Sequence, residues 1–126
     1  MVDIDKHIKH WRRGALLDWR VANELIEIRR YAHGLFFAHL ALEKLLKAHV
    51  CKQSGNIAPF IHNLVMLAQR ANLGLSSQQV DTLASMNPFN LNGRYPPIEE
   101  PRLSKKQVQK ILADAEEMMK WLKKQL

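Results

Sequence analysis

The chain has little of what disulfide-bonded, membrane-spanning and β-sheet proteins require. Its single cysteine, Cys51, cannot form an internal disulfide, so the fold suits a reducing compartment. No stretch approaches the roughly 18 uninterrupted apolar residues of a spanning helix, and the acidic N-terminal segment is not a secretory signal. Alternation of apolar and polar residues is nowhere long enough to predict a strand. We therefore expect an all-α, cytoplasmic protein without a membrane segment.

The signatures of common cofactor and metal enzymes are missing as well. The sequence has no glycine-rich phosphate loop, no nucleophile elbow and no His-Glu-x-x-His pattern. Six histidines are present, but their spacing does not bring three ligands together as a catalytic zinc requires. His39 and His49 fall in an apolar sector of a predicted helix, where a hydrogen-bonded core histidine is the usual role. We expect neither a metal nor a cofactor.

What is present is the composition of one ordinary globular domain with an excess of basic residues. The 126 residues are enough to bury a core, and we assign positions 1–126 to a single domain. The formal net charge is +7. This charge favours association with a polyanion or an acidic partner through long-range attraction, although the basic side chains are spread along the chain.

Apolar side chains at helical spacing predict five helices, at about 7–30, 31–52, 59–72, 76–86 and 104–126. Pro59 suits the first position of the third helix. Ser76 with Gln79, and Ser104 with Gln107, have the spacing of capping boxes that open the last two helices. The segment 87–102 contains four prolines, which predicts a loop without regular structure. Short connections elsewhere favour an up-and-down bundle of about five helices.

The second predicted helix has apolar residues almost all round, which is typical of a helix that is buried on more than one side. One sector is filled by leucine and alanine. The opposite side mixes His33 and the charged residues with three large apolar side chains, namely Phe36, Phe37 and Leu40. We predict that these three face a partner chain or line a cleft.

A set of polar residues carries the candidate chemistry, and each member allows two interpretations. Glu43 and Lys47 are four residues apart, the spacing of a solvent-exposed ion pair. Alternatively, Lys44, Lys47 and Arg94 converge on a phosphate, with Tyr95 stacking on a base.

Asp18 lies on the apolar face of the first helix, where an unpaired carboxylate would be costly. Either it pairs with an Arg, His or Tyr of a neighbouring helix, or it belongs to a polar site.

Four short motifs in the right order resemble those of the HEPN domain family (higher eukaryotes and prokaryotes nucleotide-binding). Residues 41–48 match A-x-E-K-x-L-K-A, and His62-Asn63-Leu64 with Leu67 matches H-x-L-x-x-L. Arg94-Tyr95-Pro96 matches an R-Y-P loop, and Trp11, Asp18 and Ala22 are similar to the family's first helix.

The resemblance implies a five-helix bundle that forms a homodimer and acts with a minimal nucleotidyltransferase as a toxin-antitoxin pair. It implies a nucleotide- or RNA-phosphate site built from the matching polar residues, which are Glu43, Lys44, Lys47, His62, Arg94 and Tyr95, with Asp18 as a further member. Some relatives are metal-independent ribonucleases with an arginine followed, after four to six residues, by a histidine. That motif is absent, because Arg29 and Arg30 lie too close to His33 and too far from His39.

Three hypotheses therefore stay open. The first is a phosphate-binding partner of a nucleotidyltransferase. The second is a ribonuclease that uses Arg94 with His62 as acid or base. The third is a dimeric interaction module without chemistry of its own.

Overall fold

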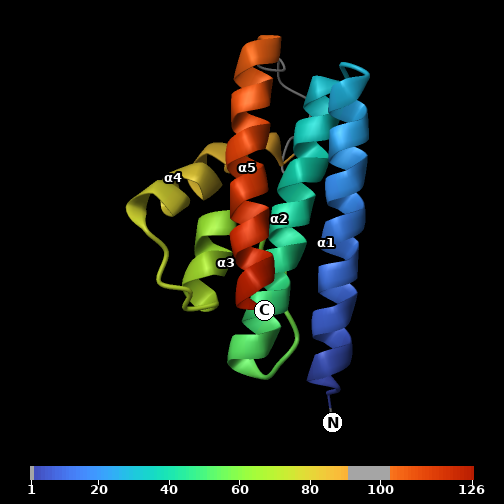
Figure 1. Cartoon of the computed structure of the whole chain (residues 1–126). Helices are drawn as coiled ribbons and strands as arrows, with labels where there is room; N and C mark the ends of the chain where they lie inside the picture. The colour runs from blue at the N-terminus through green and yellow to red at the C-terminus, as the bar shows by residue number, and fades with distance from the viewer. Residues whose placement is uncertain (1, 91–102) are drawn as a thin grey trace.

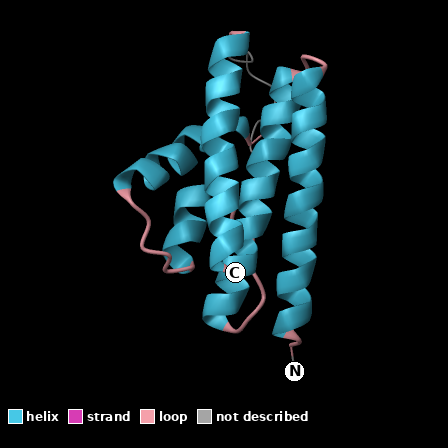
Figure 2. Ribbon diagram, viewed as in Figure 1, coloured by secondary structure: helices cyan, strands magenta, loops and turns pink. Residues whose placement is uncertain are grey.

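The computed structural model describes residues 2–90 and 103–126, and every regular element in these two ranges is helical (Figure 2). The elements are α1 (Ile4–Glu27), α2 (Tyr31–Ser54), α3 (Leu64–Arg70), α4 (Ser77–Met86), the short 3-10 helix η1 (Asn87–Phe89) and α5 (Lys105–Gln125). The predicted all-α bundle of five helices is confirmed. No helix in the described ranges is long and apolar enough to cross a membrane.

Helix α2 is the central element, since α1, α3, α5 and η1 all pack against it. Helices α1, α2 and α5 run lengthwise beside one another, and α3 and α4 lie on the side away from α1 (Figure 1). From residue 41 to residue 51 every side chain of α2 is buried except that of Lys44. This confirms that the helix is covered on more than one side. It ends at Gly55, whose left-handed φ of 65° an L side chain would adopt only with strain.

Helices α1 and α2 form a close hairpin that depends on Gly34. A Cβ added to Gly34 would lie 2.5 Å from Cδ1 of Ile26 and 3.2 Å from the carbonyl oxygen of Ala22. Asp3 caps the start of α1, since its side chain accepts a hydrogen bond from the Lys6 amide at 3.1 Å. The close approach brings polar residues of α1 within reach of α2.

The third helix is shorter than predicted, because it begins at Leu64 and not at Pro59. Asn63 caps it by accepting a hydrogen bond from the Met66 amide at 3.1 Å. The Leu64 amide donates to the side-chain oxygen of Asn87 at 2.9 Å, a contact across 23 residues. Two asparagine side chains therefore fix where α3 starts.

The last two helices begin as predicted, since Ser76 with Gln79 and Ser104 with Gln107 both form complete capping boxes. The segment between these helices is not wholly irregular, because Asn87–Phe89 forms the 3-10 helix η1. The candidate residues Arg94 and Tyr95 lie outside the described ranges.

Candidate functional site

The carboxylate of Glu43 is the common partner of three other side chains. Its Oε2 accepts a hydrogen bond from Nζ of Lys47 at 2.9 Å, one turn further along α2. Nδ1 of His62 lies 3.1 Å from Oε1 and 3.2 Å from Oε2. Nδ1 of His39, one turn earlier, lies 3.8 Å from Oε1. We call these four residues the Glu43 cluster. Three of them, at positions 39, 43 and 47, lie one turn apart along α2, and His62 comes from the segment before α3.

The ion pair between Glu43 and Lys47 is buried, so the expectation of a solvent-exposed pair is wrong. Only 5% of the Glu43 side chain and 6% of the Lys47 side chain is exposed to solvent. The indole ring of Trp11 on α1 covers the Lys47 ammonium, which lies 5.2 Å from the ring centroid. Helical periodicity gives no signal for a contact between Trp11 and a cation. The indole Nε1 is itself buried without a hydrogen-bond partner.

A second ion pair joins α1 to α2 beside the Glu43 cluster. Nζ of Lys44 lies 2.7 Å from Oδ2 of Asp18. The absence of a Cβ at Gly14 leaves room for the stem of Lys44, whose Cδ would be 3.2 Å from such an atom. Asp18 thus has a structural partner on the neighbouring helix, but this partner is a lysine and not the Arg, His or Tyr that we considered.

His62 is the member of the Glu43 cluster that reaches solvent, with 47% of its side chain exposed. Because a carboxylate can only accept hydrogen bonds, the contact with Glu43 places a proton on Nδ1 of His62. Its Nε2 is then the free nitrogen of the ring, which accepts a proton when the ring is neutral and donates a hydrogen bond when the ring is charged. A buried carboxylate therefore orients an accessible imidazole.

Two histidines of α2, His39 and His49, are buried and differ in their partners. Burial lowers the pKa of His39, and the nearby Glu43 carboxylate is the main effect that opposes this shift. Within residues 2–90 and 103–126, neither ring nitrogen of His39 has a hydrogen-bond partner of normal geometry. His49 is the predicted hydrogen-bonded core histidine, since its Nε2 lies 2.8 Å from the Leu122 carbonyl oxygen. Burial lowers the pKa of His49 as well.

The predicted phosphate-binding lysines are both paired with carboxylates. Lys44 is held by Asp18 and Lys47 by Glu43, so two positive charges face two negative ones. A phosphate could reach Lys44, whose side chain is 31% exposed, only by competing with Asp18. Lys47 is too buried for a direct contact and serves to neutralise Glu43.

The remaining candidates are partly placed by the structure. Phe36, Phe37 and Leu40 are all half-buried, and Phe37 packs against the core. The rings of Phe36 and Phe37 meet edge to face with centroids 5.6 Å apart. Cys51 is buried, which raises the pKa of its thiol and makes it unreactive. Across the described ranges no group of three His, Cys, Asp or Glu side chains is arranged to hold a metal ion.

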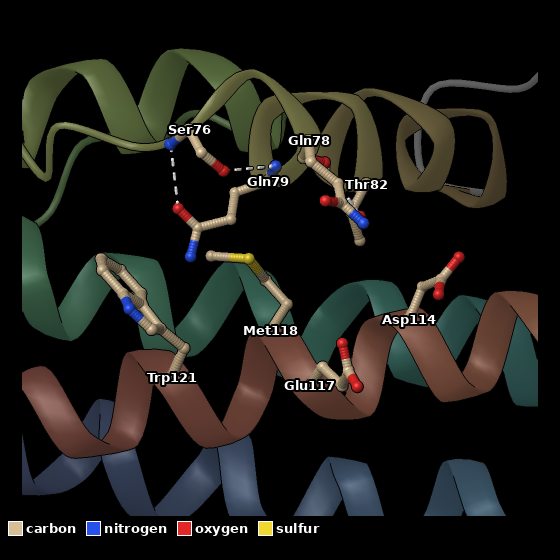
Figure 3. A pocket seen from close by; sticks show the side chains of 8 residues that line it. All are labelled: Ser76, Gln78, Gln79, Thr82, Asp114, Glu117, Met118 and Trp121. Carbon is tan, nitrogen blue, oxygen red and sulfur yellow. Dashed lines mark hydrogen bonds between the residues drawn. The ribbon is translucent and has the colours of Figure 1, made fainter.

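A separate pocket of about 450 Å³ lies between α4 and α5 (Figure 3). Its lining contains none of the predicted site residues and consists of Ser76, Gln78, Gln79, Thr82, Asp114, Glu117, Met118 and Trp121. Many of its polar groups are already bonded within the protein. Ser76 and Gln79 form the capping box, Thr82 donates to the Gln78 carbonyl, and Asp114 accepts from Lys110. Because no lining residue belongs to the Glu43 cluster, the pocket is not part of that site.

Comparison with known proteins identifies the family. The family model of the HEPN domain matches residues 8–125. The chain belongs to the HEPN domain family. The fold of this HEPN protein is similar to that of TT1696 from Thermus thermophilus, with a TM-score of 0.78 and 17% identity over 94% of this chain and 98% of that one. It is also similar to ST0689, an archaeal HEPN homologue, with a TM-score of 0.72 and 16% identity over 94% and 96% of the two chains.

At these identities the structural likeness establishes the fold alone. A search of curated proteins gave no match.

Proposed function

We propose that this HEPN protein binds the phosphate of a nucleotide or of RNA at the exposed edge of His62. The observation that carries the proposal is the contact of 3.1 Å between His62 and the buried carboxylate of Glu43. An imidazole held in this way presents one nitrogen to solvent in a fixed direction, as a phosphate ligand must. Lys47 neutralises the buried charge of Glu43 and so keeps the arrangement stable.

The charged and aromatic candidates have distinct roles in this proposal. Protonated His62 donates a hydrogen bond from Nε2 to a phosphate oxygen. Lys44 adds a second cation when a phosphate replaces Asp18 as its partner, since its side chain is the more exposed of the two lysines. Arg94 and Tyr95 would contribute a guanidinium group and an aromatic ring, and their part rests on the sequence motif alone.

A thermal-shift screen with ATP, other nucleotides and a short RNA tests the proposal. A ligand at about ten times its Kd should stabilise the folded state by roughly 1.4 kcal/mol, which raises the melting temperature by a few degrees. His62→Ala should abolish this shift. His33→Ala, which removes an exposed imidazole from the start of α2, should keep it. No shift of the parent protein with any of these ligands would refute the proposal and favour an interaction module.

Our proposal for the partners of this protein rests on the family resemblance and not on the site. We propose that it forms a homodimer through Phe36, Phe37 and Leu40, and that it acts in the cytoplasm with a minimal nucleotidyltransferase as a toxin-antitoxin-type pair. All three residues are half-buried in the single chain, which leaves apolar surface for a second chain to cover. Sedimentation should give a dimer that Phe36→Asp converts to a monomer. A parent protein that sediments as a monomer at high concentration would exclude this interface.

The same geometry favours a second function, that of a metal-independent ribonuclease. The contact between Glu43 and His62 fixes the tautomer of the imidazole, and Nε2 could then exchange a proton with a ribose hydroxyl or a leaving oxygen. Arg94 would stabilise the charge that develops on the phosphate. RNA cleavage that persists with a chelator and disappears in His62→Ala would establish this activity. RNA that stays intact over hours of incubation would exclude it.

A further inference from the structure

The solvent-facing side of α1 carries positive charge and apolar surface that nothing in the described chain covers. We call this surface the outer face of α1, and it consists of Lys9, Arg12, Arg13, Leu16, Leu17 and Arg20, which surround a shallow hollow of about 380 Å³. Leu16 is 37% exposed and Leu17 is 55% exposed. The buried residues Ala15 and Ala22 lie on the opposite side of the helix, against α2.

None of the four cations of the outer face is paired with an acid elsewhere in residues 2–90 or 103–126. The cations recur at spacings of three, four and seven or eight residues, so they form one stripe along about three turns, or roughly 16 Å, of helix. Like charges at such spacings repel one another. The two exposed leucines also forgo the free energy that burial of their apolar surface would release. The combination is unfavourable in the isolated chain and becomes favourable when an acidic and partly apolar surface covers it.

We propose that the outer face of α1 docks an acidic amphipathic helix of another protein. Carboxylates along that helix would face the four cations, and apolar side chains at its centre would cover Leu16 and Leu17. The length of the stripe matches a partner helix of about three to four turns. The four cations require a partner with negative charge, and the two leucines require apolar side chains at its centre.

Other occupants fit the outer face less well. A second copy of this chain, related by a two-fold axis, would bring four cations against four cations. An RNA backbone would pair with the cations but would leave Leu17 in water, and the stripe offers no aromatic ring for stacking. Two leucines supply little area for insertion into a membrane surface.

The inference is independent of the phosphate site, because that site uses the other side of α1. Trp11 and Asp18 face α2, where they contact Lys47 and Lys44. Loss of binding at the outer face would therefore leave the nucleotide response of the protein unchanged, and the two proposals can fail separately.

The test is a calorimetric titration of the full chain with a synthetic acidic amphipathic helix of about 18 residues, with glutamates on its flanks and leucines at its centre. A peptide of the same composition in scrambled order is the control. We expect binding of the ordered peptide that weakens as salt is raised. Leu17→Ser should weaken it about fivefold, which corresponds to roughly 1 kcal/mol of lost apolar contact. Ile57→Ser, at a side chain of almost the same exposure, 54%, should change nothing.

Arg12→Gln combined with Arg13→Gln should weaken binding further and flatten its dependence on salt, whereas Arg70→Gln should not. Both peptides binding equally well, or neither binding at about 0.5 mM, would overturn the inference. A single-stranded RNA or anionic phosphatidylserine vesicles that bind more tightly than the ordered peptide, with Leu17→Ser having no effect, would assign the face to that occupant instead.

Discussion

Replacing Glu43 by glutamine should destabilise the protein far more than the loss of an ordinary ion pair, because it leaves the Lys47 ammonium buried without an anion. The two side chains are 5% and 6% exposed and 2.9 Å apart. Removing one partner of a buried pair costs about 3–5 kcal/mol. The Trp11 ring stays over the ammonium in the variant, so we expect the lower end, about 3 kcal/mol.

Urea unfolding followed by far-UV circular dichroism measures this effect as a lower midpoint with an unchanged slope. For a domain of this size the melting temperature should fall by roughly 10 °C. Asp114→Asn provides the control, since it removes an acid from the surface pair with Lys110, whose side chains are 42% and 74% exposed. That control should cost less than about 0.5 kcal/mol.

A double variant, Glu43→Gln with Lys47→Met, removes both charges from the buried site. It should recover most of the stability that the single variant loses, because no unpaired ammonium remains. The reasoning fails if Glu43→Gln costs no more than Asp114→Asn. It also fails if the double variant is less stable than the single one.

Three further predictions concern packing, titration and capping. Gly34→Ala should lower the free energy of unfolding by about 1–3 kcal/mol, because its Cβ would lie 2.5 Å from Cδ1 of Ile26. Gly14→Ala should cost less in urea unfolding, because the nearest neighbours of its Cβ belong to the flexible Lys44 side chain, which must move from 3.2 Å, and because alanine favours a helix. Burial lowers the pKa of His39, so the unfolded chain binds a proton at this residue at a higher pH than the folded chain does. The free energy of unfolding therefore falls as the pH drops below about 6.5. The melting temperature should therefore drop between pH 7 and pH 5.5, and less steeply in His39→Gln. Ser104→Ala should cost about 1 kcal/mol by removing the cap of α5, measured against the parent in urea.

Local signals in the sequence predicted the helices well where the chain supplies its own cap. The two capping boxes, at Ser76 and Ser104, fixed the starts of α4 and α5 because both partners lie within one turn. The start of α3 was wrong because Pro59 suits a first helical position equally well, and the deciding contact is made by Asn87, far along the chain. A pattern of local residues carries no information about such a contact.

Two ion pairs of the candidate site could be predicted in part from the sequence, but their surroundings could not. The spacing of Glu43 and Lys47 predicted their ion pair, and the wheel position of Asp18 predicted a partner on another helix. Whether the first pair meets water depends on how α1 lies against α2, which places Trp11 over Lys47. Exposure is a property of the packed helices, and the spacing of Glu43 and Lys47 alone does not determine it.

The central position of α2 has a consequence for cooperativity. Helices α1, α3 and α5 each bury their apolar side against it, so no fragment that lacks α2 retains a shared core. Separate parts of the bundle therefore cannot unfold as independent units while the rest keeps its packing, and the domain should unfold in a single transition. A truncated fragment of this HEPN protein would have to include α2 to keep a shared core.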